Sequence, residues 1–103
     1  MSAKPQGHPQ IFQRAVVLRV EEFLSALAHE RGSSLHTQRA YARELRDFAE
    51  YLTAKPGPEI SIAKIEHLQI RAYLSELYGR GLSKASVARA LAAIRSWFKW
   101  LAR

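Results

Sequence analysis

Apolar residues recur every three or four positions along four stretches of the chain, a spacing that places them on one side of an α-helix. The first two stretches run from about Ile11 to Glu30 and from about Leu35 to Ala54. The third spans about Glu66 to Tyr78, and the fourth follows Ser83 and runs to about Ala102. No stretch alternates polar and apolar residues for long enough to build a sheet. The pattern predicts an all-α bundle of four helices with short connections.

Turn-forming residues separate these stretches. Ser34 and Ser83 precede the second and fourth helices, where a hydroxyl can cap free backbone N–H groups. Residues 55–58 read Lys-Pro-Gly-Pro and end the second helix, and a short extended segment is expected at 59–64. Residues 1–10 contain two prolines and a glycine without periodicity, which predicts a disordered tail before a helical domain at 11–103.

The periodic apolar residues define the expected core. Trp100 lies off the apolar arc of the fourth helix and is expected to be exposed. The residues expected to point inward are Val16, Val20, Phe23, Leu24, Leu27, Tyr41, Leu45, Phe48, Leu52, Ile70, Tyr73, Leu74, Leu77, Val87, Leu91, Ile94, Trp97, Phe98 and Leu101.

Positive charge accumulates in the last quarter of the chain. The net charge is +7, and the segment 77–103 contributes six basic residues and no acid. Lys84, Arg95 and Lys99 share the arc opposite the apolar one, with Arg89 at its margin. A solvated face normally mixes both signs, so this face favours an acidic partner over simple hydration. DNA is the first candidate because it rewards clustered cations through counterion release.

The second helix has a weaker basic cluster at its start. Arg39, Arg43 and Arg46 lie opposite its apolar stripe, but Asp47 and Glu50 follow Arg43 and Arg46 at the four-residue spacing that pairs charges on a helix. Some of this charge is therefore expected to be surface pairing. Arg39 has no acid three or four residues away and is the freest of the three.

Two hydroxyl residues and the excess of arginine over lysine also favour a nucleic-acid partner. Ser34 and Thr37 lie at the start of the second helix, where free backbone N–H groups can hold a phosphate. For Ser34 a simple capping role explains the residue equally well. Arginine outnumbers lysine by 11 to 5, and its planar guanidinium suits phosphates and guanine edges. Nucleic acid is thus favoured over a membrane surface.

The sequence lacks the residues that several other classes of function require. The chain has no cysteine, which excludes disulfides and thiolate metal sites and fits a reducing, cytoplasmic setting. Its four histidines lack ligand spacing, so neither a metal nor a cofactor is expected. No Ser/His/Asp set, glycine-rich phosphate loop or acid pair is legible, and no apolar run is as long as a membrane span. No catalytic site is therefore expected in this chain.

Three segments together resemble a known family. They read SLHT at 34–37, YARELRDFAEYL at 41–52 and GLSKASVARALAAIRSWFKWL at 81–101. In this order they resemble the N-terminal core-binding, SAM-like domain of phage-integrase-type tyrosine recombinases, and the last segment is most similar to the Xer type, which resolves chromosome dimers. The resemblance spans about 16–102. It implies an orthogonal four-helix bundle that forms one half of a C-shaped clamp on DNA.

The resemblance also implies which residues meet DNA and which partners act with them. In the family the second and fourth helices cross the major groove of the recombination site, and the partners are double-stranded DNA and other recombinase subunits, without a membrane. Glu44 departs from the family's frequent Asp, and Glu66 from its Ser or Thr cap. The family's catalytic domain is expected after Arg103, so the chain resembles an excised domain of a longer recombinase. The DNA-binding residues expected from the resemblance and the charged faces together are Ser34, Thr37, Arg39, Arg43, Lys84, Ser86, Arg89, Arg95 and Lys99.

Two other functions remain open at the level of sequence. A stand-alone helical DNA-binding regulator needs a recognition helix after a short turn, and the segment 79–83 before the fourth helix supplies such a turn. A helical protein-interaction bundle is the other alternative, and an exposed Trp100 favours it.

Overall fold

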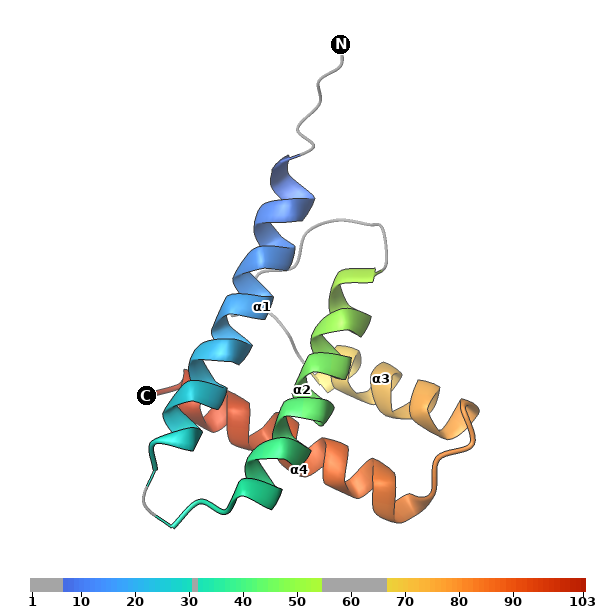
Figure 1. Ribbon diagram of the computed structural model, residues 1–103. Helices are drawn as coiled ribbons and strands as arrows, with labels where there is room; N and C mark the ends of the chain where they lie inside the picture. Colours follow the sequence, from blue (N-terminus) through green and yellow to red (C-terminus); the bar gives the residue numbers. More distant parts are fainter. Residues whose placement is uncertain (1–6, 31, 55–66) are drawn as a thin grey trace.

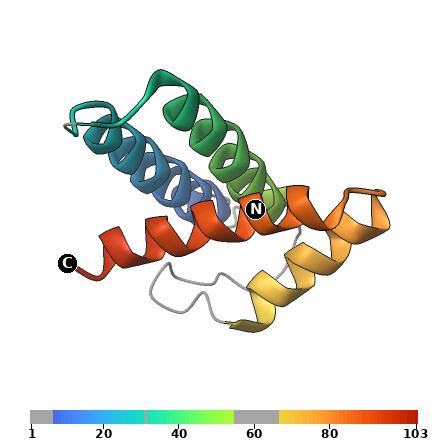
Figure 2. The ribbon, with the colours of Figure 1, turned by 90° about the horizontal axis from the view of Figure 1, so that it is seen from below.

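Four helices form the structure, a computed structural model that describes residues 7–30, 32–54 and 67–103, with side chains from Ala15 onwards. They are α1 (Gly7–Ala28), α2 (Leu35–Ala54), α3 (His67–Gly79) and α4 (Lys84–Leu101). Helices α1 and α2 lie side by side and antiparallel (Figure 1). Helix α4 crosses the lower ends of both, and α3 packs against α4 (Figures 1 and 2). The predicted all-α bundle is confirmed.

The helix boundaries follow the signals in the sequence closely. Helix α2 has the predicted bounds, and α4 follows the predicted cap at Ser83, whose side chain accepts a hydrogen bond from the backbone N–H of Ser86. Helix α1 begins at Gly7, inside the segment 1–10 that the sequence predicts to be a tail. The start predicted at Ile11 is therefore too late. The segments predicted at 55–58 and 59–64 lie outside the described residues.

A single core joins all four helices. Phe48 of α2 lies at its centre, with its ring centroid 5.0 Å from that of Tyr73 in α3 and 6.3 Å from that of Trp97 in α4. All three side chains are fully buried, as are Val16 and Val20 of α1. Burying these large rings supplies much of the hydrophobic stabilisation in so small a domain. These five predicted core positions are confirmed.

The inward face of α4 differs from the prediction. Ala90 and Ala93 are fully buried, whereas Leu91 is only half-buried. Alanine has no side chain beyond Cβ, so it lets the backbone of α4 approach the neighbouring helices closely, and the packed seam follows Ala90 and Ala93. A pattern based on large apolar residues placed the centre of this face at Leu91 and was wrong there.

Trp100 is the second correction. The sequence predicts an exposed ring, but the structure packs it against the core, with its centroid 5.6 Å from that of Phe23 in α1. The guanidinium of Arg19 lies 4.9 Å from the centroid of the Trp100 ring, in the arrangement of a cation–π contact. Trp100 therefore joins the end of α4 to α1, and the feature that favoured a protein-interaction bundle is absent.

Candidate nucleic-acid interface

The predicted DNA-binding residues lie on α2 and α4 where these helices cross. Tyr41 of α2 and Ser96 of α4 mark the crossing, because their hydroxyl oxygens lie 3.3 Å apart. An open groove lies on either side of the crossing. We call the groove that contains Arg43 and Arg89 the inner groove, and the one that contains Ser34 and Lys99 the outer groove.

The inner groove has a volume of about 610 Å³ and brings three predicted residues together. Arg43 lies on α2, whereas Ser86 and Arg89 lie in the first turns of α4. Arg89 Nη2 donates a hydrogen bond to Ser86 Oγ at 3.0 Å, which holds this guanidinium at the groove. The residues that line the inner groove are Arg43, Glu44, Arg46, Asp47, Glu50, Leu82, Ser86 and Arg89.

The outer groove has a volume of about 680 Å³ and contains Ser34, Thr37 and Lys99, three more predicted residues. The capping role of Ser34 is confirmed, because its Oγ accepts a hydrogen bond from the backbone N–H of Thr37 at 3.0 Å. Ser34 Oγ also donates to Thr37 Oγ1 at 2.9 Å. Both hydroxyls therefore stabilise the start of α2, at the edge of a groove that also contains a cation.

The remaining three predicted residues line neither groove. Arg39 on α2 and Lys84 and Arg95 on α4 are exposed. The structure thus brings six of the nine predicted residues into two grooves at one helix crossing, and it leaves three cations on the surrounding surface.

Ion pairing separates these cations from other arginines. Within the described residues, none of the six predicted cations (Arg39, Arg43, Lys84, Arg89, Arg95 and Lys99) forms an ion pair. In contrast, Arg46 Nε bonds Glu21 of α1 at 2.8 Å, and Arg19 bonds Glu22 at 2.6 Å. The expected Arg46–Glu50 pair is wrong, because the fold brings Glu21 to Arg46 from a separate helix. The predicted cations therefore keep their charge available for an external anion.

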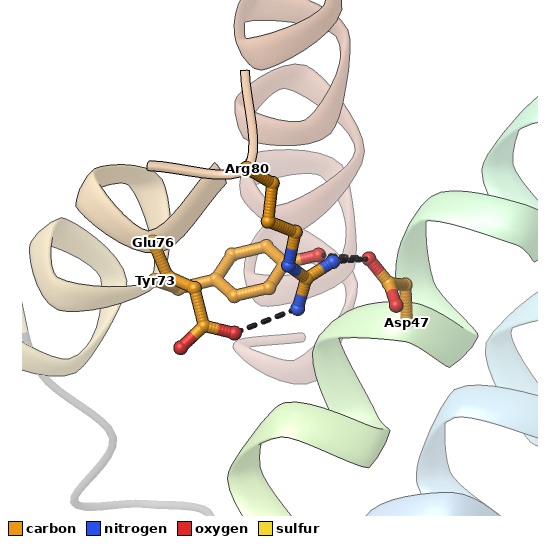
Figure 3. Close-up of polar contacts among 4 residues, drawn as sticks. All are labelled: Asp47, Tyr73, Glu76 and Arg80. Atoms are coloured by element: carbon orange, nitrogen blue, oxygen red, sulfur yellow. Dashed lines mark hydrogen bonds and ion pairs between the residues drawn. The ribbon is translucent and has the colours of Figure 1, made fainter. Parts of the chain in front are cut away.

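A polar cluster joins α2 to α3 (Figure 3), and one of its members, Asp47, also lines the inner groove. Asp47 accepts a hydrogen bond from the Tyr73 hydroxyl at 2.8 Å and lies 3.3 Å from Arg80 Nη1. Arg80 also bonds Glu76 at 2.7 Å. The expected pairing of Arg43 with Asp47 is therefore wrong, and Arg43 stays free.

The cluster has a structural consequence. Burial and the bonded Asp47 both raise the pKa of the Tyr73 hydroxyl, so this hydroxyl stays protonated as a donor. Arg80 lies in the turn that precedes α4, so its contact with Asp47 links this turn to α2. Sequence reasoning missed this cluster because Tyr73 and Arg80 lie 26 and 33 residues from Asp47 along the chain.

Glu44 is a further groove residue that the sequence did not single out as functional. It is half-buried beside Arg43, and no hydrogen bond or ion pair to its carboxylate occurs within the described part of the chain. Burial raises the pKa of this carboxyl, the positive charges of Arg43 and Arg89 act against that rise, and Asp47 adds to it. A carboxylate thus lies within the electrostatic influence of Arg43 and Arg89 in the inner groove.

The described ranges contain neither of two other kinds of site. There, no three His, Asp or Glu side chains come close enough together to hold a metal ion. No helix among the described residues combines the length and apolar character needed to span a membrane.

Comparison with known proteins places this chain in a family. The family described as phage integrase, N-terminal SAM-like domain, matches residues 20–103. A tyrosine recombinase XerC of Ralstonia pickettii is 40% identical over 92% of this chain, and that of Pelobacter propionicus is 40% identical over 82%. A tyrosine recombinase XerD of Rhizobium meliloti is 38% identical over 80% of the chain. No solved structure matches.

These matches define the class. The four-helix bundle has the architecture of an all-α SAM-like domain, and the match covers most of its length. The chain belongs to the family of phage integrase N-terminal SAM-like domains. It spans about a quarter of the length of the curated relatives that it matches, 26% of the Ralstonia protein and 25% of the Rhizobium one.

Proposed function

We propose that this chain is the N-terminal clamp domain of a site-specific tyrosine recombinase, and that it binds duplex DNA through the crossing of α2 and α4. The observation that supports this most strongly is the set of unpaired cations around the two grooves. Arg39, Arg43 and Arg89 have no acidic partner within the described residues, although Asp47 lies four residues after Arg43 on α2. DNA phosphates would satisfy these charges and release counterions.

The arrangement suits a duplex geometrically as well. Two helices that cross at a shared surface present cations along two directions, so they can meet both phosphate strands that border a major groove. The start of α4 points its Ser86 and Arg89 side chains into the inner groove, where base edges would be reached. The relatives are named tyrosine recombinases, and this supports the same role for the protein of which this chain is a part.

In such a protein the strand breakage and rejoining would be performed by residues outside this domain. This chain would position the recombination site, and neighbouring recombinase subunits would act on the same DNA. The similarity to XerC and XerD proteins favours a role in chromosome partition and a cytoplasmic location. We expect the chain alone to form no covalent adduct with DNA, and a trapped adduct would reveal a nucleophile within it.

Fluorescence anisotropy with a labelled duplex tests the proposal. Affinity should fall by roughly 10²- to 10³-fold as salt rises from about 50 to about 200 mM, because about five phosphate contacts release counterions. Affinity that is independent of salt, or absent at low salt, would contradict DNA binding through this face. A stand-alone regulator would bind in the same assay, so complementation by the full gene in a strain that lacks recombinase activity separates the two functions.

A further inference from the structure

The inner groove contains carboxylates, although a surface that binds an anion gains affinity from cations alone. Three acids line it: Glu44, Asp47 and Glu50. Each carboxylate near a phosphate chain lowers affinity by repulsion. Their presence therefore needs a reason in the structure or in the ligand.

Two of the three acids are accounted for by their surroundings. Asp47 accepts the Tyr73 hydroxyl and pairs with Arg80, so its charge is used within the fold. Glu50 is exposed, and its charge is solvated at the groove's margin. Neither residue has a carboxylate that is both partly removed from water and left unbonded.

Glu44 alone combines these two properties among the three acids. It is half-buried, it lines the groove, and within the described residues its carboxylate has no hydrogen-bond or ion-pair partner. A carboxylate that loses water without gaining a donor is destabilising. The nearby positive charges of Arg43 and Arg89 offset part of that cost, but neither arginine forms a hydrogen bond to the carboxylate. Its oxygens thus remain available as acceptors in the groove.

The major groove of DNA supplies a matching donor. Cytosine presents its N4 amino group there, and a Glu or Asp side chain accepts a hydrogen bond from it. Guanine, the base paired with that cytosine, presents the O6 and N7 acceptors that arginine reads. A carboxylate flanked by two arginines therefore complements the two edges of one G·C pair.

We propose that Glu44 is a specificity-determining residue of this domain, and that its carboxylate accepts a hydrogen bond from the N4 amino group of a cytosine in the recombination site. The inference rests on the proposed DNA binding. Arg43 and Arg89 supply attraction and guanine or phosphate contacts, and Glu44 rejects base pairs that place an acceptor or a methyl group at its position. The repulsion from phosphates that Glu44 adds is the cost of this selectivity.

Selection from a pool of duplexes with a randomised segment tests the proposal on the 103-residue chain. The wild type should enrich cytosine at one position by about fivefold or more over the other bases. Glu44→Gln should shift that preference to adenine, because an amide pairs with adenine N6 and N7. Glu44→Ala should lose the preference at that position while keeping those elsewhere.

Glu50→Gln is the matched control, because it removes the same charge from the same helix and the same groove. It should raise overall affinity about as much as Glu44→Gln does and leave the base preference unchanged. An unchanged preference in both Glu44 variants would overturn the inference and leave Glu44 as an electrostatic modulator. In that case the wild type still binds DNA with salt dependence, whereas loss of wild-type binding would contradict the proposed function itself.

Discussion

Two regions of this molecule use arginine in opposite ways. Between α1, α2 and α3, Arg46 and Arg80 bond acids from other turns or helices, and Arg80 has two such partners. At the crossing of α2 and α4, Arg39, Arg43 and Arg95 have no acidic partner within the described residues. These three arginines therefore form no ion pair that joins the helices of the described part of the chain. The partners of an arginine, more than its residue type, separate an arginine that joins helices from one whose charge has no acid beside it.

Removal of the shared core should have the largest effect. Phe48→Ala should lower the free energy of unfolding by about 3–5 kcal/mol, because Phe48 is fully buried between Tyr73 and Trp97. Urea denaturation measures this loss in the free energy of unfolding. Affinity for DNA per folded molecule should stay unchanged, because Phe48 supports both regions without lining either groove. Leu91→Ala serves as the comparison and should cost less, since Leu91 is only half-buried.

Disruption of the polar cluster around Asp47 should have the next largest effect. Asp47→Ala should lower the free energy of unfolding by about 1–3 kcal/mol, because it leaves the buried Tyr73 hydroxyl without its acceptor. Tyr73→Phe is the matched control, since it removes the donor instead and should cost less. Thermal denaturation of both variants gives the comparison. Equal stability of Asp47→Ala and the wild type would show that the bonds in Figure 3 do not hold α3 to α2.

A single change in the unpaired region should alter binding alone. Arg43→Ala should weaken DNA binding and make the slope of log affinity against log salt shallower by about one unit. The free energy of unfolding should move by less than about 0.5 kcal/mol, because Arg43 is exposed and unpaired. Anisotropy and denaturation on the same preparation separate these two results. A lower melting temperature with unaltered binding would show that Arg43 is structural.

The surface ion pair should give the smallest effect. Arg46→Ala should cost about 0.2–1 kcal/mol of stability, since the pair with Glu21 is largely solvated. The bond from Arg46 lowers the pKa of Glu21 below its ordinary value of 4.5, so this stabilisation is fully present above pH 4.5. It is lost as the pH falls through the lowered pKa. Denaturation at neutral and acidic pH should show the gap between wild type and variant closing on the acid side.

Local signals in the sequence predicted the fold well. Ser34 and Ser83 marked the starts of α2 and α4 because capping depends on neighbours within three residues. The buried Ala90 and Ala93 could not be recognised, because alanine's small size gives no periodic signal until the neighbouring helix is known. Trp100 was misplaced for the same reason, since Phe23 lies in a distant part of the chain.

The candidate site was predicted less completely than the fold. The cations of α4 were found because the segment 77–103 contains no acid, and those of α2 because they lie opposite its apolar stripe. Their pairing state was not readable, because Glu21 and Arg80 reach α2 from elsewhere in the sequence. The half-buried state of Glu44 likewise depends on where α4 crosses α2.

The slope of log affinity against log salt, measured for two double variants, tests the contrast between these regions most directly. The wild type should give a slope of about −4 to −5, which corresponds to about five phosphate contacts. Arg43→Ala with Arg89→Ala should make the slope shallower by about two units. Arg19→Ala with Arg80→Ala removes the same charge from paired positions outside both grooves and should leave the slope within about half a unit of the wild type. Equal slopes for the two double variants would contradict the account, because binding would then depend on net charge and not on the crossing of α2 and α4.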